Sequence, residues 1–303
     1  MFVDQISLSA KRLSCGFSQV MLQENRLTGL LFMLGIGFNS WLMLACAVVG
    51  SCSSMLAAMM YRADTADLDR GLYGYNGALI GLAVSFYLPL SLSSVIILIV
   101  CSMLATVIQR LLVTVRVAPL TGPFVITGWM ALLLAQWFDL NDTVLPIVGN
   151  DLAVTVFVDE LLSEGAVQAI SHGLGQVMFQ GNTVTGLLFI AGLAVAAPKV
   201  ALWGVFGSVL GYEAATLLQY PEPLVAAGLF GFNGVLVAIV LGDRFPNRFL
   251  LIAGGIIMTI LITRGFQLLG ITPLTAPFVL TSWIIFLLDC LSRTGKSRNK
   301  AAG

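Results

Sequence analysis

Uncharged polar side chains recur in pairs along this chain, inside segments that are otherwise apolar. A buried amide or hydroxyl costs free energy unless it is hydrogen-bonded, so each pair requires a partner. Groups of this kind suit the recognition of an uncharged solute that donates hydrogen bonds. The pairs are Gln19 and Gln176, Gln23 and Gln180, Asn25 and Asn182, Asn76 and Asn233, Thr121 and Thr275, and Thr127 and Thr281.

Prolines bracket one pair of threonines, in PLTGP at 119–123 and in PLTAP at 273–277. Proline has no N–H, so carbonyl oxygens of the preceding turn lose their helical partners. We therefore expect acceptor oxygens to gather near each threonine. The alternative is that the prolines only begin or kink a helix.

Aromatic side chains stand beside these polar pairs. Tyr75 and Phe232 each precede an Asn-Gly, and Phe179 occupies the position that Leu22 holds in the earlier segment. Apolar faces with oxygen atoms along their edges form a slot for a flat, neutral molecule rich in N–H donors. Urea, with its planar faces and its N–H groups, meets this description.

The sequence contains no arrangement typical of catalysis or of metal binding. His172 is the single histidine, and a lone histidine without a partner at ligand or triad spacing is more often structural. The five cysteines lie in or beside apolar segments, which favours buried reduced thiols over disulfides or a metal site. We therefore expect a protein that is not an enzyme and that uses no cofactor.

The polar pairs belong to one sequence unit that occurs twice. The offset between copies is 157 residues for the first two matching segments and 154 for the third. We divide the chain into a first repeat at 1–138, an extracytoplasmic connector at 139–165 and a second repeat at 166–303 that ends in a cytoplasmic tail. The matches are SQVMLQENRLTGLLF (18–32) with GQVMFQGNTVTGLLF (175–189), GLYGYNGAL (71–79) with GLFGFNGVL (228–236), and PLTGPFVITGW (119–129) with PLTAPFVLTSW (273–283).

The composition places the chain in a lipid bilayer. Of its 303 residues, 58% are hydrophobic and 10% are charged, and the mean hydropathy is +0.96. A soluble domain of this size is neither so apolar nor so poor in charge. The formal net charge is zero and no basic stripe is present, which excludes nucleic acid as a partner.

Each repeat contains five apolar segments preceded by a shorter one. A membrane span takes roughly 17 to 25 mostly apolar residues, and a shorter segment is typical of a re-entrant half-helix. The predicted fold is therefore an all-α integral membrane protein of two repeats, each with five transmembrane helices and one re-entrant half-helix. In the first repeat the short segment is 14–23 and the spans are 27–39, 41–60, 72–90, 93–109 and 119–138. In the second the short segment is 169–179 and the spans are 184–197, 200–219, 228–241, 249–266 and 273–288.

An odd number of spans places the second repeat in the bilayer upside down relative to the first, so the repeats are inverted. The basic residues test the orientation independently. With a cytoplasmic amino terminus, fourteen of the fifteen Lys and Arg residues fall on the cytoplasmic side, and only Arg264 falls outside. Both termini are then cytoplasmic.

The predicted spans contain almost no ionisable groups, whereas ion-coupled carriers usually place charged residues inside the helix bundle. Glu213 is an exception, but its counterpart Leu56 is apolar, which favours a structural or interfacial acid. Glu24 lies beside Arg26 and is expected to form a local ion pair at the membrane edge. This scarcity of charge indicates a neutral solute.

At these residues the sequence resembles the urea transporter family, and the resemblance covers essentially the whole chain. It rests on QVML (19–22) with QVMF (176–179), on GLYGYNG with GLFGFNG, and on the duplicated PLTxPF. The resemblance implies a homotrimer in the cell (inner) membrane, with a pore in each protomer between two inverted halves. It also implies channel-like permeation of urea down its gradient.

The resemblance also assigns roles to residues. It implies that Gln19 and Gln176 offer oxygens at the ends of the re-entrant helices, and that Thr121 and Thr275 offer hydroxyl acceptors at the middle of the pore. Among the implied slot walls, two positions depart from the family pattern: Tyr75 stands where phenylalanine is commoner, and Leu22 replaces an aromatic residue. The implied slot walls are Leu22, Tyr75, Leu79, Phe179, Phe232 and Leu236.

Two other classes of protein remain open. The first is a secondary carrier, or a channel, for another small neutral amide or for ammonia; a coupled carrier calls for an intramembrane acid, and Glu213 is the candidate. The second is a structural membrane scaffold, which does not explain why polar residues rather than packing residues recur.

Overall fold

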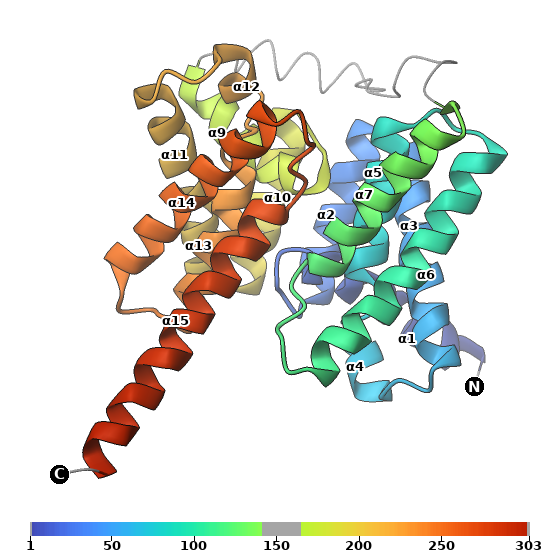
Figure 1. Ribbon diagram of the computed structural model, residues 1–303. Helices are drawn as coiled ribbons and strands as arrows, with labels where there is room; N and C mark the ends of the chain where they lie inside the picture. The colour runs from blue at the N-terminus through green and yellow to red at the C-terminus, as the bar shows by residue number, and fades with distance from the viewer. Residues whose placement is uncertain (1, 141–164, 302–303) are drawn as a thin grey trace.

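The computed structural model describes residues 2–140 and 165–301, with side chains described for 7–140 and 165–293. Every regular element in these ranges is a helix. The predicted connector at 139–165 lies almost wholly outside them. Figure 1 shows the helices of the earlier part of the chain on one side and those of the later part on the other, with α2 and α10 between them.

The helices follow the same order in the two halves. In the earlier half they are α1 (Phe2–Gln19), α2 (Arg26–Asn39), α3 (Trp41–Met60), α4 (Thr65–Asp69), α5 (Tyr75–Tyr87), α6 (Leu92–Thr114) and α7 (Gly122–Trp137). In the later half they are α9 (Gly165–Gly175) with the 3-10 turn η2 (Gln176–Met178), α10 (Thr183–Ala196), α11 (Pro198–Leu217), α12 (Glu222–Ala226), α13 (Phe232–Arg244), α14 (Phe249–Leu268) and α15 (Ala276–Ala301).

Several helices are long and apolar enough to cross a membrane. In the described part of the chain these are α3, α6, α11, α14 and the Ala276–Arg293 part of α15. The segments Gly165–Met178 and Thr183–Ala196 also qualify as a pair, bent by 74° at the break between them. Such a bend is typical of a broken span or a re-entrant loop, and α2 and α7 are shorter apolar helices. The chain is therefore an all-helical, multi-pass membrane protein.

Several elements differ from the sequence prediction. The first short helix, predicted at 14–23, is α1 and begins at Phe2, because charged residues near its start do not interrupt helical geometry. The short helices α4 and α12 were not predicted, since five residues carry no usable hydrophobic period. The offset between the two repeats changes from 157 to 154 residues within α6 and its counterpart α14, because α6 has 23 residues and α14 has 20.

The paired asparagines at the helix breaks cap the helices that follow. The Asn25 side-chain oxygen accepts from the backbone N–H groups of Leu27 (2.9 Å) and Thr28 (3.0 Å). The Asn182 oxygen accepts from Thr185 N in the same way (2.8 Å). An N-cap side chain satisfies donors that the first helical turn leaves without partners. These two members of the polar pairs therefore fix where α2 and α10 begin.

The two halves meet along α2 and α10. Thr28 Oγ1 donates to the carbonyl oxygen of Gly192 (2.7 Å), and Thr185 Oγ1 donates to that of Gly35 (2.8 Å). The start of each helix thus contacts the end of the other, so α2 and α10 run antiparallel. Between them the Phe32 and Phe189 rings lie 4.8 Å apart.

Close helix packing positions the two helices that carry the Asn-Gly motifs. A Cβ atom on Gly50 of α3 would lie 2.1 Å from the carbonyl oxygen of Gly77 in α5. A Cβ atom on Gly207 of α11 would lie 2.4 Å from that of Gly234 in α13. No side chain fits at either contact. Glycine at these positions therefore lets α5 and α13 lie directly against α3 and α11.

Candidate functional site

The paired threonines of the two halves contact each other in the interior of the protein. Thr121 Oγ1 and Thr275 Oγ1 lie 2.7 Å apart, and each side chain is 3% exposed. Each threonine directly precedes the first turn of a helix, α7 or α15. Two more bonds cross between the halves nearby, from Trp129 Nε1 to Thr272 O and from Trp283 Nε1 to Ala118 O, both 2.8 Å. The sequence pairing of the threonines is thus a spatial pairing as well.

The paired asparagines arrange the backbone next to the threonines. Asn76 Oδ1 accepts the Phe124 N–H (3.1 Å), and Asn233 Oδ1 accepts the Phe278 N–H (3.2 Å). In a regular helix these two N–H groups would donate to the carbonyl oxygens four residues earlier, those of Leu120 and Leu274. Because the asparagines accept the N–H groups instead, the two carbonyl oxygens are left for other partners. The expected acceptor oxygens therefore exist, and an asparagine as well as the prolines produces them.

The carbonyl oxygens of Leu120 and Leu274 accept from different donors in the two halves. The Tyr75 hydroxyl donates to Leu120 O at 2.6 Å. Phe232 stands at the corresponding position of the later half and has no hydroxyl, and Leu274 O accepts from Asn233 Nδ2 at a longer 3.3 Å. The acceptor in the later half is therefore the less tightly engaged of the two.

A cavity of about 120 Å³ opens beside Thr275. Phe179 and Phe232 form part of its wall, Gln176 supplies an amide, and Leu274 and Thr275 supply oxygens. Aromatic and polar residues of the later half therefore border one space. The other lining residues are Phe86, Tyr87, Val177, Leu229, Gln267, Thr272 and Pro273.

The backbone around the site is strained at four non-glycine residues. Leu22 and Phe179 have φ angles of 62° and 61°, and Leu120 and Leu274 both have φ of 47°. The left-handed region costs about 1–2 kcal/mol for a residue with a Cβ atom. Such residues gather where the surrounding structure holds a functional geometry. Here they place the Leu22 and Phe179 side chains and turn the chain just before each threonine.

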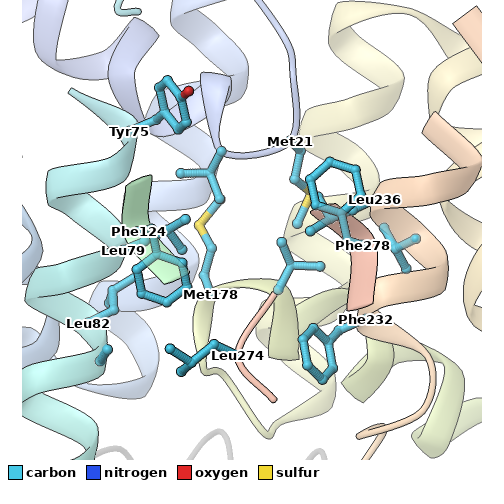
Figure 2. Close-up of a cluster of buried hydrophobic side chains, with 14 of the residues drawn as sticks. Met21, Tyr75, Leu79, Leu82, Phe124, Met178, Phe232, Leu236, Leu274 and Phe278 are labelled. Atoms are coloured by element: carbon cyan, nitrogen blue, oxygen red, sulfur yellow. The ribbon is translucent and has the colours of Figure 1, made fainter. Parts of the chain in front are cut away.

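Leu79 and Leu236 are fully buried in the apolar core. Figure 2 shows both in a cluster of buried hydrophobic side chains that also includes Phe124 and Phe278. Neither leucine lines the cavity beside Thr275. Of the ten predicted site residues, Gln176, Phe179, Phe232 and Thr275 border this cavity. Thr121 does not border it but contacts Thr275.

An ion pair lies next to Gln19, at the outer edge of the site in the earlier half. Gln19 Nε2 donates to Arg70 O (3.0 Å), and the Arg70 guanidinium pairs with Glu24 Oε2 (2.8 Å). The hydrogen bond that Arg70 donates to Glu24 raises the pKa of Arg70 above its usual value. Glu24 forms an ion pair, but the expected local pair with neighbouring Arg26 is wrong. Its partner is Arg70, because the fold brings the turn after α4 to the end of α1.

Sequence reasoning missed Asn39. Its Nδ2 donates to Gln180 Oε1 (2.7 Å), and its Oδ1 accepts from Asn182 Nδ2 (2.9 Å). Asn39 thus bridges the helix break that follows Phe179. Its counterpart in the later half is Ala196, so the duplication gives no signal for it. The only available signal is an amide at the end of an apolar helix.

The described residues hold no group of three or more His, Cys, Asp or Glu side chains that could bind a metal. His172 is buried at the end of α9. Cys15, Cys46 and Cys101 are buried as expected, whereas Cys52 and Cys290 are exposed, because they lie on outward faces of α3 and α15. The site therefore offers uncharged hydrogen-bonding groups and aromatic faces.

An uncharged site between helices of a multi-pass membrane protein is suited to carry a neutral solute through the bilayer. The comparisons agree with this class. The family model described as "Urea transporter" matches residues 11–290, so the chain belongs to the urea transporter family.

Mammalian relatives support the same assignment. Urea transporter 1 of Ovis aries is 26% identical over 299 residues, covering 90% of this chain and 75% of the relative. Urea transporter 1 of Capra hircus is 25% identical over 302 residues, with the same coverage. That of Rattus norvegicus is 27% identical over 245 residues, covering 76% and 62%. The protein is therefore a transport protein for urea and not an enzyme.

Proposed function

We propose that urea moves down its gradient through a pore in each protomer, between two inverted halves formed by residues 1–138 and 166–303. The observation that carries this proposal is the contact of Thr121 with Thr275 beside a cavity walled by Phe179 and Phe232. It joins the two halves at a neutral, oxygen-lined point.

The inverted arrangement rests on the contacts between the halves. The start of α2 bonds to the end of α10 and the reverse also holds, which is what a two-fold axis between equivalent helices produces. The two tryptophan bonds to Thr272 O and Ala118 O repeat this reciprocity. A site on such an axis lies near the bilayer midplane.

Urea enters beside Gln176 and loses water as its flat faces slide between the aromatic walls. Its N–H groups then donate to Leu274 O and to the two threonine hydroxyls, which exchange their mutual hydrogen bond for bonds to urea. Leu120 O and Gln19 follow on the far side, with Leu22, Tyr75, Leu79 and Leu236 completing the walls. Replacing hydration stepwise keeps any single position from trapping the solute.

Ions are excluded by the same surfaces. None of the ten pore residues is charged, so a cation that leaves water finds no counter-charge in the slot. The charged groups near the path, Glu24 and Arg70, are about half exposed and pair with each other at its mouth. Ion coupling is therefore not part of the mechanism.

The protomer is expected to assemble as a homotrimer in the cell (inner) membrane, with both termini cytoplasmic and the connector at 139–165 extracytoplasmic. In Figure 1 both chain ends lie at the lower side of the molecule. Large apolar side chains such as Trp137 and Leu250, 83% and 85% exposed, are suited to contact lipid or a neighbouring protomer.

Purified protein in liposomes tests the function directly. After a urea gradient is imposed, light scattering follows shrinking and reswelling. We expect rapid reswelling in urea without any sodium or proton gradient, and no matching conductance for sodium or potassium. A strict requirement for an ion gradient indicates a secondary carrier, while faster flux of another small amide or of ammonia reassigns the solute. Absence of flux for every solute indicates a scaffold.

A further inference from the structure

Urea needs a hydrogen-bond donor as well as acceptors inside the protein. Its N–H groups are expected to use Leu274 O and the Thr275 hydroxyl, and both residues border the cavity beside Thr275. Its carbonyl oxygen also leaves water on entry and requires a donor in exchange. Among the described residues, the side-chain amides that border this cavity are those of Gln176 and Gln267, and only Gln176 is assigned to the oxygen-lined path.

The Gln267 amide is oriented by a neighbouring arginine. Arg264 Nη1 donates to Gln267 Oε1 at 3.4 Å, within the last turn of α14. A guanidinium group has N–H donors and no acceptor, so the amide atom that faces it must be the oxygen. The N–H groups of Gln267 Nε2 are therefore left for another partner. Because Gln267 borders the cavity, that partner can be a solute inside it.

Arg264 is itself held by an aromatic ring. Its guanidinium carbon lies 5.5 Å from the centroid of the Tyr220 ring, which packs against the Phe230 ring at 5.0 Å. A cation over the face of a ring is attracted by the negative charge of that face. In the predicted orientation Arg264 is the one basic residue outside the cytoplasmic face, an exception to the positive-inside rule. Its contact with Gln267 gives this exception a function.

The duplication does not repeat this pair. The counterparts of Arg264 and Gln267, each 154 residues earlier, are Arg110 and Val113. Arg110 donates instead to Tyr61 O (2.9 Å) at the end of α3, and the Val113 side chain has no N–H group. The oriented amide therefore belongs to the later half alone, and the path for urea differs between its two ends.

We propose that Gln267 contacts the substrate, donating from Nε2 to the carbonyl oxygen of urea, and that Arg264 is the positioning residue that fixes this amide. The inference rests on the proposed function, because it assigns the orientation of urea in the same cavity. The solute lies with its oxygen toward α14 and its N–H groups toward Leu274 O and Thr275. Thiourea benefits less from this donor, since sulfur is a weak acceptor. Gln267 therefore makes the site selective for a carbonyl group.

Gln267→Met tests the donor, because methionine is similar in length and has no N–H group. At low solute concentration we expect urea flux to fall about two- to tenfold, the effect of one net hydrogen bond. Thiourea flux should fall less, so the ratio of urea flux to thiourea flux decreases. Gln267→Glu keeps the shape of the side chain, pairs with Arg264 and offers only acceptors, and it should lower the ratio further. Light scattering on proteoliposomes measures both solutes.

Gln136→Glu is the matched control for the added charge. Gln136 is exposed on α7 and does not border the cavity, so both fluxes should stay at their wild-type values. The role of Arg264 has its own pair of variants. Arg264→Met lets the Gln267 amide turn and should lower the flux ratio. Arg264→Lys retains a cation that only donates, and it should keep the ratio close to that of the wild type.

A wild-type flux ratio in both Gln267 variants would overturn the proposal, even if their total flux falls, because a merely structural role changes both solutes alike. Equal ratios in Arg264→Met and the wild type would remove the positioning role of Arg264. A wild type that conducts no urea contradicts the proposed function instead, so the two failures are distinguishable.

Discussion

The hydroxyl of Thr275 is the group on which the mechanism depends most directly. Thr275→Val keeps the shape of the side chain, removes its oxygen and leaves Thr121 Oγ1 without its 2.7 Å partner. Leaving a buried polar group without a partner costs about 1–3 kcal/mol, and about 1.4 kcal/mol corresponds to tenfold in rate. We expect urea flux to fall by about tenfold or more, as measured by light scattering on proteoliposomes.

Thr281→Val is the matched control for this change. Thr281 lies in the same helix and is fully buried, but its hydroxyl has no hydrogen-bond partner among the described residues. Flux through this variant should stay close to that of the wild type. If Thr275→Val conducts like the wild type, or if both variants lose flux equally, Thr275 does not act as an acceptor for urea.

The Tyr75 hydroxyl donates a hydrogen bond to Leu120 O, a carbonyl oxygen that urea is expected to use as an acceptor. Tyr75→Phe removes the 2.6 Å bond to Leu120 O and makes the two halves alike, because Phe232 is the counterpart. The freed carbonyl then accepts from urea, so we expect flux to rise by about two- to fivefold, in line with a net hydrogen bond of about 0.5–1 kcal/mol. A loss of flux would indicate that the hydroxyl itself assists permeation.

At the scale of single residues, the sequence predicts the functional side chains of the site better than its functional backbone groups. Thr121 and Thr275 recur at matching positions, and the fold brings their hydroxyls into contact. The prolines predicted free carbonyl oxygens near each threonine, but not that these would be Leu120 O and Leu274 O. Their availability depends on Asn76 and Asn233 taking the N–H groups of Phe124 and Phe278.

At the scale of elements, Asn39 joins the end of α2 to the helix break between η2 and α10. Asn39→Ala leaves Gln180 Oε1 and Asn182 Nδ2 without this partner, which costs about 1–3 kcal/mol for each buried group. The break then holds Phe179 and Gln176 less firmly. We expect urea flux to fall several-fold with a higher half-saturating urea concentration, measured in proteoliposomes, and a lower unfolding temperature in detergent.

Ser51→Ala serves as the control for Asn39→Ala. Ser51 is fully buried in α3, and its hydroxyl has no partner among the described residues, so its removal should change neither flux nor stability appreciably. Asn39→Ala with wild-type flux and a lower unfolding temperature would mean that Asn39 stabilises the fold without positioning the site.

Helix boundaries followed the hydrophobic pattern closely in two long helices, α3 and α14, whereas α6 and α15 continue past the predicted spans to Thr114 and Ala301. The predicted span 41–60 coincides with α3, and 249–266 ends two residues before α14 does. The predicted span 72–90 is longer than α5, which begins only at Tyr75, because Gly71 adopts φ of 77° in the turn before it. The hydrophobic periodicity of a sequence does not reveal a left-handed turn that lies between apolar residues.

At the scale of the whole molecule, the inverted arrangement predicts that the two helix breaks face opposite sides of the membrane. Glu24 and Gly181 are counterparts, both are exposed, and they precede the antiparallel helices α2 and α10.

Single cysteines at these two positions report the side of the membrane that each faces, after the exposed Cys52 and Cys290 are replaced by serine. In intact cells we expect a membrane-impermeant maleimide to label Gly181→Cys at once and Glu24→Cys only after permeabilisation. The same background without an added cysteine controls for the buried thiols of Cys15, Cys46 and Cys101. Labelling of both positions from one side would contradict the inversion. It would also remove the symmetry that brings Thr121 and Thr275 together at the midplane, and the pore between the halves would have to be abandoned.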